Sequence, residues 1–184
     1  MPPRSEKALV QRIRAGDHEA CVELIRQFHA PIYRLLAHLC RDAHLAEDLA
    51  QETFLAAWAK ISGFNVASSL NTWLHTIAYR KFIDAHRRHE RTVTISNDAS
   101  VDRAPANNPD PYASALASDE NRRLYCALDR LRPAERDVIV LHYLQGLTYE
   151  DLAAIVDEPT GTVKWRTRQA LEHLRTALES KSRK

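Results

Sequence analysis

The sequence predicts an all-α protein made of two small helical domains joined by a flexible linker. The 184-residue chain has only four glycines, few β-branched runs, and apolar residues that recur every three to four positions, as in amphipathic helices. One stretch, Thr94 to Ser118, breaks this pattern with three prolines, many Asn, Asp and Ser residues and few large apolar ones, too few to order it. We therefore expect domains at 1–93 and 119–184 and a linker at 94–118.

Charge and cysteine content narrow the class of protein. The 26 Lys and Arg residues against 24 Asp and Glu leave a net charge of only +2, so attraction to nucleic acid must come from local clusters. Such clusters occur between Arg80 and Arg91 and from Lys164 onward. The three cysteines form no CxxC pair, which argues against disulfides and a thiolate zinc site. We find no apolar signal core and no run long enough to span a bilayer, and expect a cytoplasmic protein without direct membrane insertion.

The first informative helix is "HLAEDLAQETFLAAWAKI", which has two different faces. One is a core stripe formed by Ala46, Ala50, Thr53, Phe54, Ala57 and Ile61. Opposite it, Asp48, Gln51, Glu52 and Leu55 are spaced at i, i+3, i+4 and i+7. Acidic residues repel phosphate, so this face suits a protein contact better than a DNA contact. A solvated acidic face explains the segment equally well.

The next segment, "GFNVASSLNTWLHTIAYRKFIDAHRRHER", predicts a polar loop followed by a helix that ends in cations. The expected core stripe of this helix is Leu70, Trp73, Leu74, Ile77 and Ala78. Tyr79, Phe82 and Ile83 fall away from that stripe, and the cations follow them. Rings beside Lys and Arg suit unpaired DNA, because bases stack on rings while cations follow the backbone. Residues such as Trp73, Phe82 and Ile83 are, however, more often part of a simple core.

The C-terminal domain begins with helix-boundary signals. Pro133 suits a first helical turn, and Gly146 suits the end of that helix. Thr148 and Asp151 resemble a capping box that opens a short helix. The residues expected to point inward from this short helix are Leu152, Ala153 and Val156. A turn at Asp157 to Pro159 follows, and Thr160 or Thr162 would cap the last helix.

The last helix carries a core stripe and a cationic outer face. The stripe consists of Val163, Thr167, Ala170, Leu174 and Leu178. Trp165 and Arg168 lie opposite, with Lys164 on the flank, and a short helix, a tight turn and such a helix form the helix-turn-helix pattern. In a major groove Trp165 would meet a thymine methyl or a sugar, and Lys164 and Arg168 would reach phosphate or guanine. The alternative for Trp165 is packing against a neighbouring helix.

Three ordered segments carry a family resemblance: "DLAQETFLAAWAKI", "NTWLHTIAYRKFIDAHRR" and, after the linker, "LRPAERDVIVLHYLQGLTYEDLAAIVDEPTGTVKWR". They resemble the bacterial RNA polymerase sigma factors of the extracytoplasmic function group (group IV). The likeness covers nearly the whole chain outside 94–118, including "LVQRIRAGDHEACVELIRQF". It implies an alternative sigma factor that binds core RNA polymerase and directs promoter-specific transcription initiation. It also implies a region 2-like domain at 1–93, a region 4-like domain at 119–184 and an anti-sigma factor or other regulatory protein as partner.

The resemblance assigns three sets of contact residues. The set facing core polymerase is Asp48, Gln51, Glu52 and Leu55. The set facing the minus-ten DNA, where a flipped base is captured, is Phe64, Asn65, Ser68, Ser69, Asn71, Arg80, Lys81, Arg87 and Arg88. The set facing the minus-thirty-five DNA is Thr160, Gly161, Thr162, Lys164, Trp165 and Arg168.

This sequence departs from the family pattern at four positions. Trp165 stands where the family often has Ser, and Thr76 and Arg80 stand where Arg and Asn are common. Those departures bear on which promoter bases are read. Asp157 replaces a usual turn Gly, which Asp tolerates because it visits left-handed conformations more readily than most residues.

Two other classes of protein compete with this interpretation. A conventional helix-turn-helix regulator would bind duplex DNA alone, but the linker and the acidic face argue against it. An enzyme could use His86 and His89, or His38, Cys40 and His44, as metal ligands. No HExxH, nucleophile elbow or phosphate loop occurs, so we expect no catalysis, no metal and no cofactor.

Overall fold

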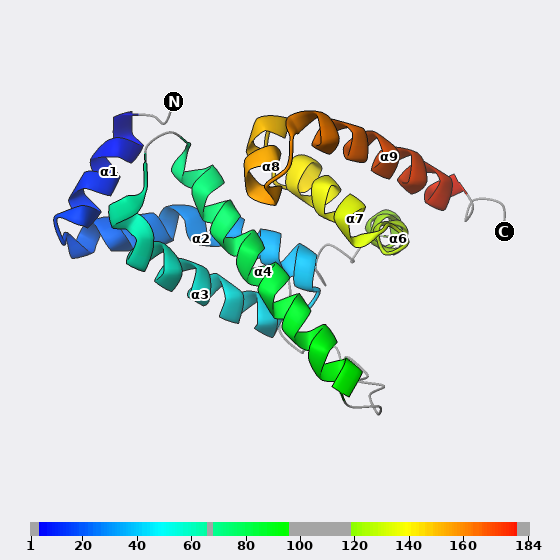
Figure 1. Cartoon of the computed structure of the whole chain (residues 1–184), viewed down its shortest axis with the longest axis horizontal. Helices are drawn as coiled ribbons and strands as arrows, with labels where there is room; N and C mark the ends of the chain where they lie inside the picture. Colours follow the sequence, from blue (N-terminus) through cyan, green and yellow to red (C-terminus); the bar gives the residue numbers. More distant parts are fainter. Residues whose placement is uncertain (1–3, 66–67, 96–118, 180–184) are drawn as a thin grey trace. The chain divides into compact units, whose positions relative to one another are not determined.

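The computed structural model describes residues 4–65, 68–95 and 119–179, and all regular elements in these residues are helical (Figure 1). The predicted all-α class is therefore confirmed. The chain divides into two compact units, Met1–Asn108 and Pro109–Lys184. Most of the linker expected at 94–118 lies outside the described residues. Its first two positions, Thr94 and Ile95, are instead the last residues of a helix.

The described residues of the first unit form four α-helices and one short 3-10 turn. They are α1 (Arg4–Arg14), α2 (His18–Cys40), α3 (Ala43–Lys60), η1 (Ile61–Gly63) and α4 (Leu70–Ile95). Helices α2, α3 and α4 pack together around the core, and α1 packs on α2 (Figure 1). Asp17 caps α2 by accepting from the amides of Glu19 and Ala20, and Asp42 caps α3 in the same way. These caps satisfy amide groups that a helix start leaves unpaired.

Helix α3 buries the stripe that the sequence predicts for it. Ala46, Ala50, Thr53, Ala57 and Ile61 are buried, while Phe54 is half-buried. Leu49 is also buried, although the predicted stripe omits it. The Thr53 hydroxyl donates to the Leu49 carbonyl at 2.7 Å, which satisfies a polar group inside the core.

Helix α4 is anchored at its start by contacts from two directions. The Ser69 hydroxyl accepts from the Thr72 amide at 3.1 Å, and the Glu6 carboxylate of α1 accepts from the Leu70 amide at 3.1 Å. Four residues of the predicted stripe are buried, and Trp73 is half-buried. Phe82 is buried as well, so it belongs to the core and is not available for base stacking.

The second unit is formed by α6 (Asp119–Leu128), α7 (Pro133–Ile139), η2 (Val140–Leu144), α8 (Tyr149–Val156) and α9 (Thr160–Glu179). Pro133 lies in the first turn of α7, as predicted. The chain continues from α7 into η2, a π-helical segment that ends at Leu144, and Gly146, two residues later, has a φ of +68°. That left-handed conformation favours glycine.

The predicted capping box of α8 is present. The Asp151 amide donates to the Thr148 hydroxyl at 3.1 Å, and the Thr148 amide donates to the Asp151 carboxylate at 3.1 Å. Asp157 ends the helix in the left-handed region at φ 59°, and its amide donates to the Ala153 carbonyl. Asp therefore does serve at this turn position.

The predicted inward face of α8 needs a correction. Leu152 is buried as expected, but the second buried residue is Ile155, and Ala153 and Val156 are only half-buried. In a helix of eight residues the apolar pattern is too short to define the direction of the core face, which is set by packing against α9. The turn that follows is held by Arg166, whose guanidinium contacts the Glu158 carboxylate at 2.6 Å.

Candidate functional site

The outward side of α3 combines acidic and large apolar side chains. Asp48 and Gln51 are exposed, Glu52 is half-exposed, and Leu55 is 72% exposed. Trp58, which the sequence interpretation did not assign, is 53% exposed. We call Asp48, Gln51, Glu52, Leu55 and Trp58 the α3 outer face. Large exposed apolar groups surrounded by polar ones are typical of a protein-binding surface.

The signal for Trp58 was present in the sequence. It lies three residues after Leu55 and seven after Gln51, the spacing of a single helical face. Aromatic residues are counted as core by default, because most large apolar side chains are buried. The exposed position of Trp58 became evident only with the packing of α3.

Glu52 on this face is paired with Lys81 of α4. The two side chains approach to 2.8 Å, and each is partly exposed. The hydrogen bond from Lys81 lowers the pKa of the Glu52 carboxyl, and the charge of Arg88 acts in the same direction. The sequence interpretation assigned Glu52 to polymerase and Lys81 to DNA, whereas the structure brings the two side chains together. A groove lined by Glu52, Lys81, Asp84, Arg87 and Arg88 lies between α3 and α4.

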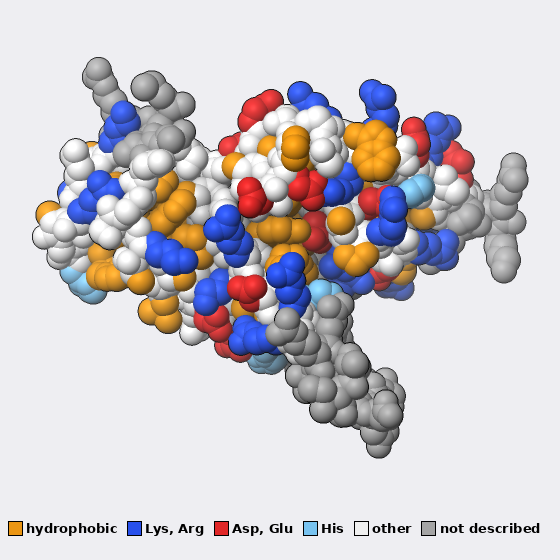
Figure 2. All heavy atoms as spheres, viewed as in Figure 1, with side chains coloured by type: hydrophobic (Ala, Val, Ile, Leu, Met, Phe, Trp, Pro, Cys, Tyr) orange, Lys and Arg blue, Asp and Glu red, His pale blue; other side chains and the backbone are white. Residues whose placement is uncertain are grey.

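Three further cations of α4 face solvent. Arg80, Arg87 and Arg88 are exposed, and Figure 2 shows Lys and Arg side chains spaced along the surface of this helix with acidic groups among them. Tyr79 is half-buried beside them. A helix surface of this kind is able to follow a phosphate backbone.

The loop before α4 has both buried and accessible residues. Phe64 is only 4% exposed, and its ring centre lies 4.8 Å from that of Trp73. Its side chain therefore supports the loop from beneath and does not reach solvent. Asn65 is exposed, and Ser68, Ser69 and Asn71 are half-buried. Val66 and Ala67 lie outside the described residues.

Arg14 of α1 helps to hold this loop, a role that the sequence interpretation missed. Its guanidinium donates to the backbone carbonyls of Ile61 and Phe64, the first at 3.1 Å. These residues are 47 and 50 positions apart from Arg14 in the chain. No local sequence pattern reports a contact of that separation.

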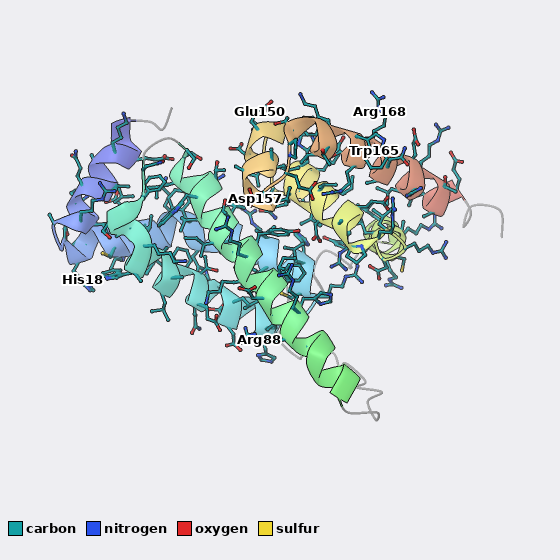
Figure 3. The ribbon with its side chains drawn as sticks, viewed as in Figure 1. His18, Arg88, Glu150, Asp157, Trp165 and Arg168 are labelled. Atoms are coloured by element: carbon teal, nitrogen blue, oxygen red, sulfur yellow. The ribbon has the colours of Figure 1, made fainter. Side chains whose placement is uncertain are left out.

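The start of α9 presents the predicted minus-thirty-five set to solvent. Gly161, Thr162, Lys164 and Arg168 are exposed, and Thr160 is half-buried. Trp165 is 59% exposed, so it does not pack inside its own unit. Figure 3 labels Trp165 and Arg168 on α9, and the Arg168 side chain extends away from the helix. The predicted core stripe is buried from Val163 to Leu174, but its last member, Leu178, is exposed.

The histidines considered as metal ligands are not gathered into a site. Within the described ranges there is no group of three or more His, Cys, Asp or Glu side chains that could hold a metal ion. The His86 ring stacks on Phe82 with centres 6.0 Å apart. Among the same described helices, none is both long and apolar enough to cross a bilayer.

Each of the two units contains a match to a known family model. Residues 24–92 match the family model for sigma-70 region 2, and residues 127–176 match that for sigma-70 region 4. The region 2 match includes the α3 outer face and most of α4. The region 4 match includes α7, α8 and most of α9.

Individual relatives are similar over most of the chain. ECF RNA polymerase sigma factor SigK of Mycobacterium tuberculosis is 33% identical over 187 residues, which covers 97% of each chain. SigE of Mycolicibacterium smegmatis is 35% identical over 164 residues, or 87% of this chain, and the match spans 62% of that longer relative.

Solved structures show the same fold. The sigma factor RpoE of Bartonella quintana, in complex with the anti-sigma factor NepR, has a TM-score of 0.68 and 30% identity, covering 85% of this chain and 95% of that one. CnrH, in complex with the cytosolic domain of CnrY, has a TM-score of 0.72 at 22% identity, with 95% and 97% covered, and shows the fold alone. The chain therefore belongs to the extracytoplasmic function sigma factors, which bind RNA polymerase and direct promoter-specific transcription initiation.

Proposed function

We propose that the α3 outer face binds core RNA polymerase and that each unit contacts one promoter element. The boundaries that we propose for these roles are 1–95 for the region 2 domain, since α4 extends to Ile95, 96–118 for the linker and 119–184 for the region 4 domain. The observation that carries the polymerase assignment is the exposure of Leu55 and Trp58 beside Asp48 and Gln51. Exposed leucine and tryptophan lose unfavourable contact with water when a partner covers them.

The minus-ten assignment relies on the accessible part of the loop and on the cations of α4. Asn65, Ser68, Ser69 and Asn71 offer hydrogen-bonding groups for an unstacked base, and Arg80, Arg87 and Arg88 offer charge for the backbone. Because Phe64 is buried, we propose that it supports the loop and does not contact the DNA directly. Lys81 forms an ion pair with Glu52. Binding of DNA by Lys81 therefore competes with that ion pair.

The minus-thirty-five assignment relies on the outward side of α9. Lys164 and Arg168 are one helical turn apart and exposed, and Trp165 lies between them in sequence. Cations at this spacing suit phosphate or guanine, and the indole suits a thymine methyl group. Since base edges carry the sequence information, Trp165 is the residue here that would give this protein its own promoter preference.

We also propose a regulatory partner and a cytoplasmic location. The support for the partner is the relative RpoE, which is 30% identical and forms a complex with an anti-sigma factor. Core polymerase and promoter DNA are cytoplasmic, so the proposed contacts require that location. We assign no catalytic reaction to the chain itself, because the proposed roles need only binding surfaces.

Charge reversal at Asp48 tests the polymerase contact. We expect Asp48→Lys to weaken binding to core RNA polymerase by roughly 5- to 30-fold, since a like-charge or mismatched charge at a protein interface costs about 1–2 kcal/mol or more. Asp48 is exposed on α3, so the melting temperature should change little. Glu172→Lys, an equal charge change at an exposed position of α9, is the control. Equal affinities of wild type and Asp48→Lys for core enzyme would disprove the contact.

A further inference from the structure

Three side chains from three successive helical elements of the second unit meet at Tyr149. The His142 ring of η2 stacks on the Tyr149 ring of α8, with centres 4.3 Å apart and planes 25° apart. The ammonium group of Lys164, on α9, lies 5.6 Å from the centre of the same Tyr149 ring. That distance is within the range of a cation–π contact. Tyr149 therefore contacts both the His142 ring and one of the proposed DNA-contacting cations.

The His142 ring is held in place by a hydrogen bond to the backbone. The Nδ1 of His142 is 2.7 Å from the Leu147 carbonyl oxygen, so this nitrogen donates its hydrogen there and the ring plane is fixed. Tyr149 is the first residue of α8, directly after the Thr148 capping position. Two local anchors thus set the position of the ring that faces Lys164.

We propose that Tyr149 is a positioning residue for Lys164, holding its ammonium group at the start of α9 so that Lys164 meets the minus-thirty-five DNA with little loss of side-chain freedom. This inference rests on the proposed DNA role of Lys164. Tyr149 itself needs no contact with DNA for this role. His142 supports the Tyr149 ring through its stacking contact.

Lys164 benefits from a positioning residue because a lysine side chain is flexible. A lysine side chain has a flexible stem of four carbons. Immobilising such a side chain at an interface costs conformational entropy. A ring beneath the ammonium group restricts it before DNA arrives, so less freedom is lost on binding. The attraction of the cation for the ring face keeps this arrangement while leaving the charge exposed to a phosphate or a guanine.

A double-mutant cycle on the full-length chain, assembled with core RNA polymerase, tests this role. The four proteins are wild type, Tyr149→Leu, Lys164→Ala and the combination, and the measured quantity is the dissociation constant for a promoter duplex at fixed salt. We expect Tyr149→Leu alone to weaken binding by roughly two- to tenfold, the range for freeing one ordered side chain. In the Lys164→Ala background the same change should have almost no effect, because the residue that it positions is gone.

Two further measurements distinguish the positioning of Lys164 from a general loss of folded structure. Tyr149→Phe keeps the ring and loses only the hydroxyl, so it should retain near-wild-type affinity. The salt dependence should also differ: Lys164→Ala should reduce the slope of log K against log salt by up to about one unit, whereas Tyr149→Leu keeps the charge and should leave most of the slope in place. Circular dichroism of each variant reports its helix content.

Each result has one meaning. If Tyr149→Leu weakens binding equally with Lys164 present or absent, the positioning role is wrong and Tyr149 acts through the fold or directly. If Tyr149→Leu has no effect while Lys164→Ala does, the positioning role is also wrong, but the DNA role of Lys164 stands. If Lys164→Ala itself has no effect, the proposed function of Lys164 fails and the inference fails with it.

Discussion

Replacing Leu55 and Trp58 together with alanine is expected to lower the affinity of the protein for core RNA polymerase by roughly 30-fold or more. Exposed tryptophan and leucine are 53% and 72% accessible here, and a tryptophan at the centre of an interface typically contributes about 2 kcal/mol or more. The same exposure means that little packing within the first unit is lost. The melting temperature should therefore change by only a few degrees at most.

Titration of labelled protein with core enzyme measures this effect. Ile25→Ala is a matched control, because Ile25 is an exposed large apolar residue in the same unit but on α2. The control should bind core enzyme like the wild type. A double variant that keeps its helix content and retains full affinity would mean that α3 does not present the polymerase contact.

The largest effect on stability is expected at Glu135, a buried carboxylate in α7. Its side chain is 2% exposed. It accepts from the Arg132 guanidinium at 2.9 Å and the Arg132 backbone amide at 3.3 Å, and it faces Nδ1 of His173 at 3.1 Å. These contacts, above all the one with the Arg132 side chain, lower the pKa of Glu135 from 4.5 to about 2. Glu135 thereby links the start of α7 to α9.

Glu135→Gln should lower the free energy of unfolding by about 2 kcal/mol at neutral pH, a value that allows for the solvent exposure of Arg132. The carboxylate has a lower pKa in the folded than in the unfolded chain, so its stabilisation is present above about pH 4.5 and is lost as pH falls toward about 2. The difference in stability between wild type and variant should therefore shrink over that range.

Urea unfolding followed by circular dichroism, repeated from about pH 7 to about pH 3, measures the difference. Glu172→Gln removes an exposed carboxylate from α9 and should show almost no difference at any pH. A Glu135→Gln difference that stays constant with pH would show that packing, and not charge, gives Glu135 its importance.

The sequence predicted most of the fold because local rules govern helices. The repeat of apolar residues located α3, α4 and α9, and the Thr148–Asp151 pair and Pro133 marked helix starts. These signals depend on neighbours within four residues, which a single sequence displays. Ile155 was missed because α8 is too short for its apolar repeat to fix a direction.

The candidate contacts were harder to predict where they depend on distant residues. Glu52 and Lys81 are 29 residues apart, and no periodicity joins them. The burial of Phe64 depends on Trp73 across a loop, and the exposure of Trp58 depends on which side of α3 the other helices cover. Such properties arise from tertiary packing, which local patterns in the sequence do not reveal.

We propose that this chain recognises promoters through two separate DNA contacts that core polymerase holds in place at the same time. The two compact units carry different candidate DNA surfaces, on α4 and on α9. Two weak contacts become one strong contact when a scaffold holds both in register, because the second binds at a high effective concentration.

The most direct test is the affinity of the full chain for a promoter duplex at one fixed salt concentration, measured with and without core RNA polymerase. We expect weak binding by the chain alone and binding at least about 100-fold tighter with core enzyme, lost when either promoter element is scrambled. Tight, specific binding of the free chain to both elements at once would contradict the proposed dependence on core polymerase and favour a conventional DNA-binding regulator.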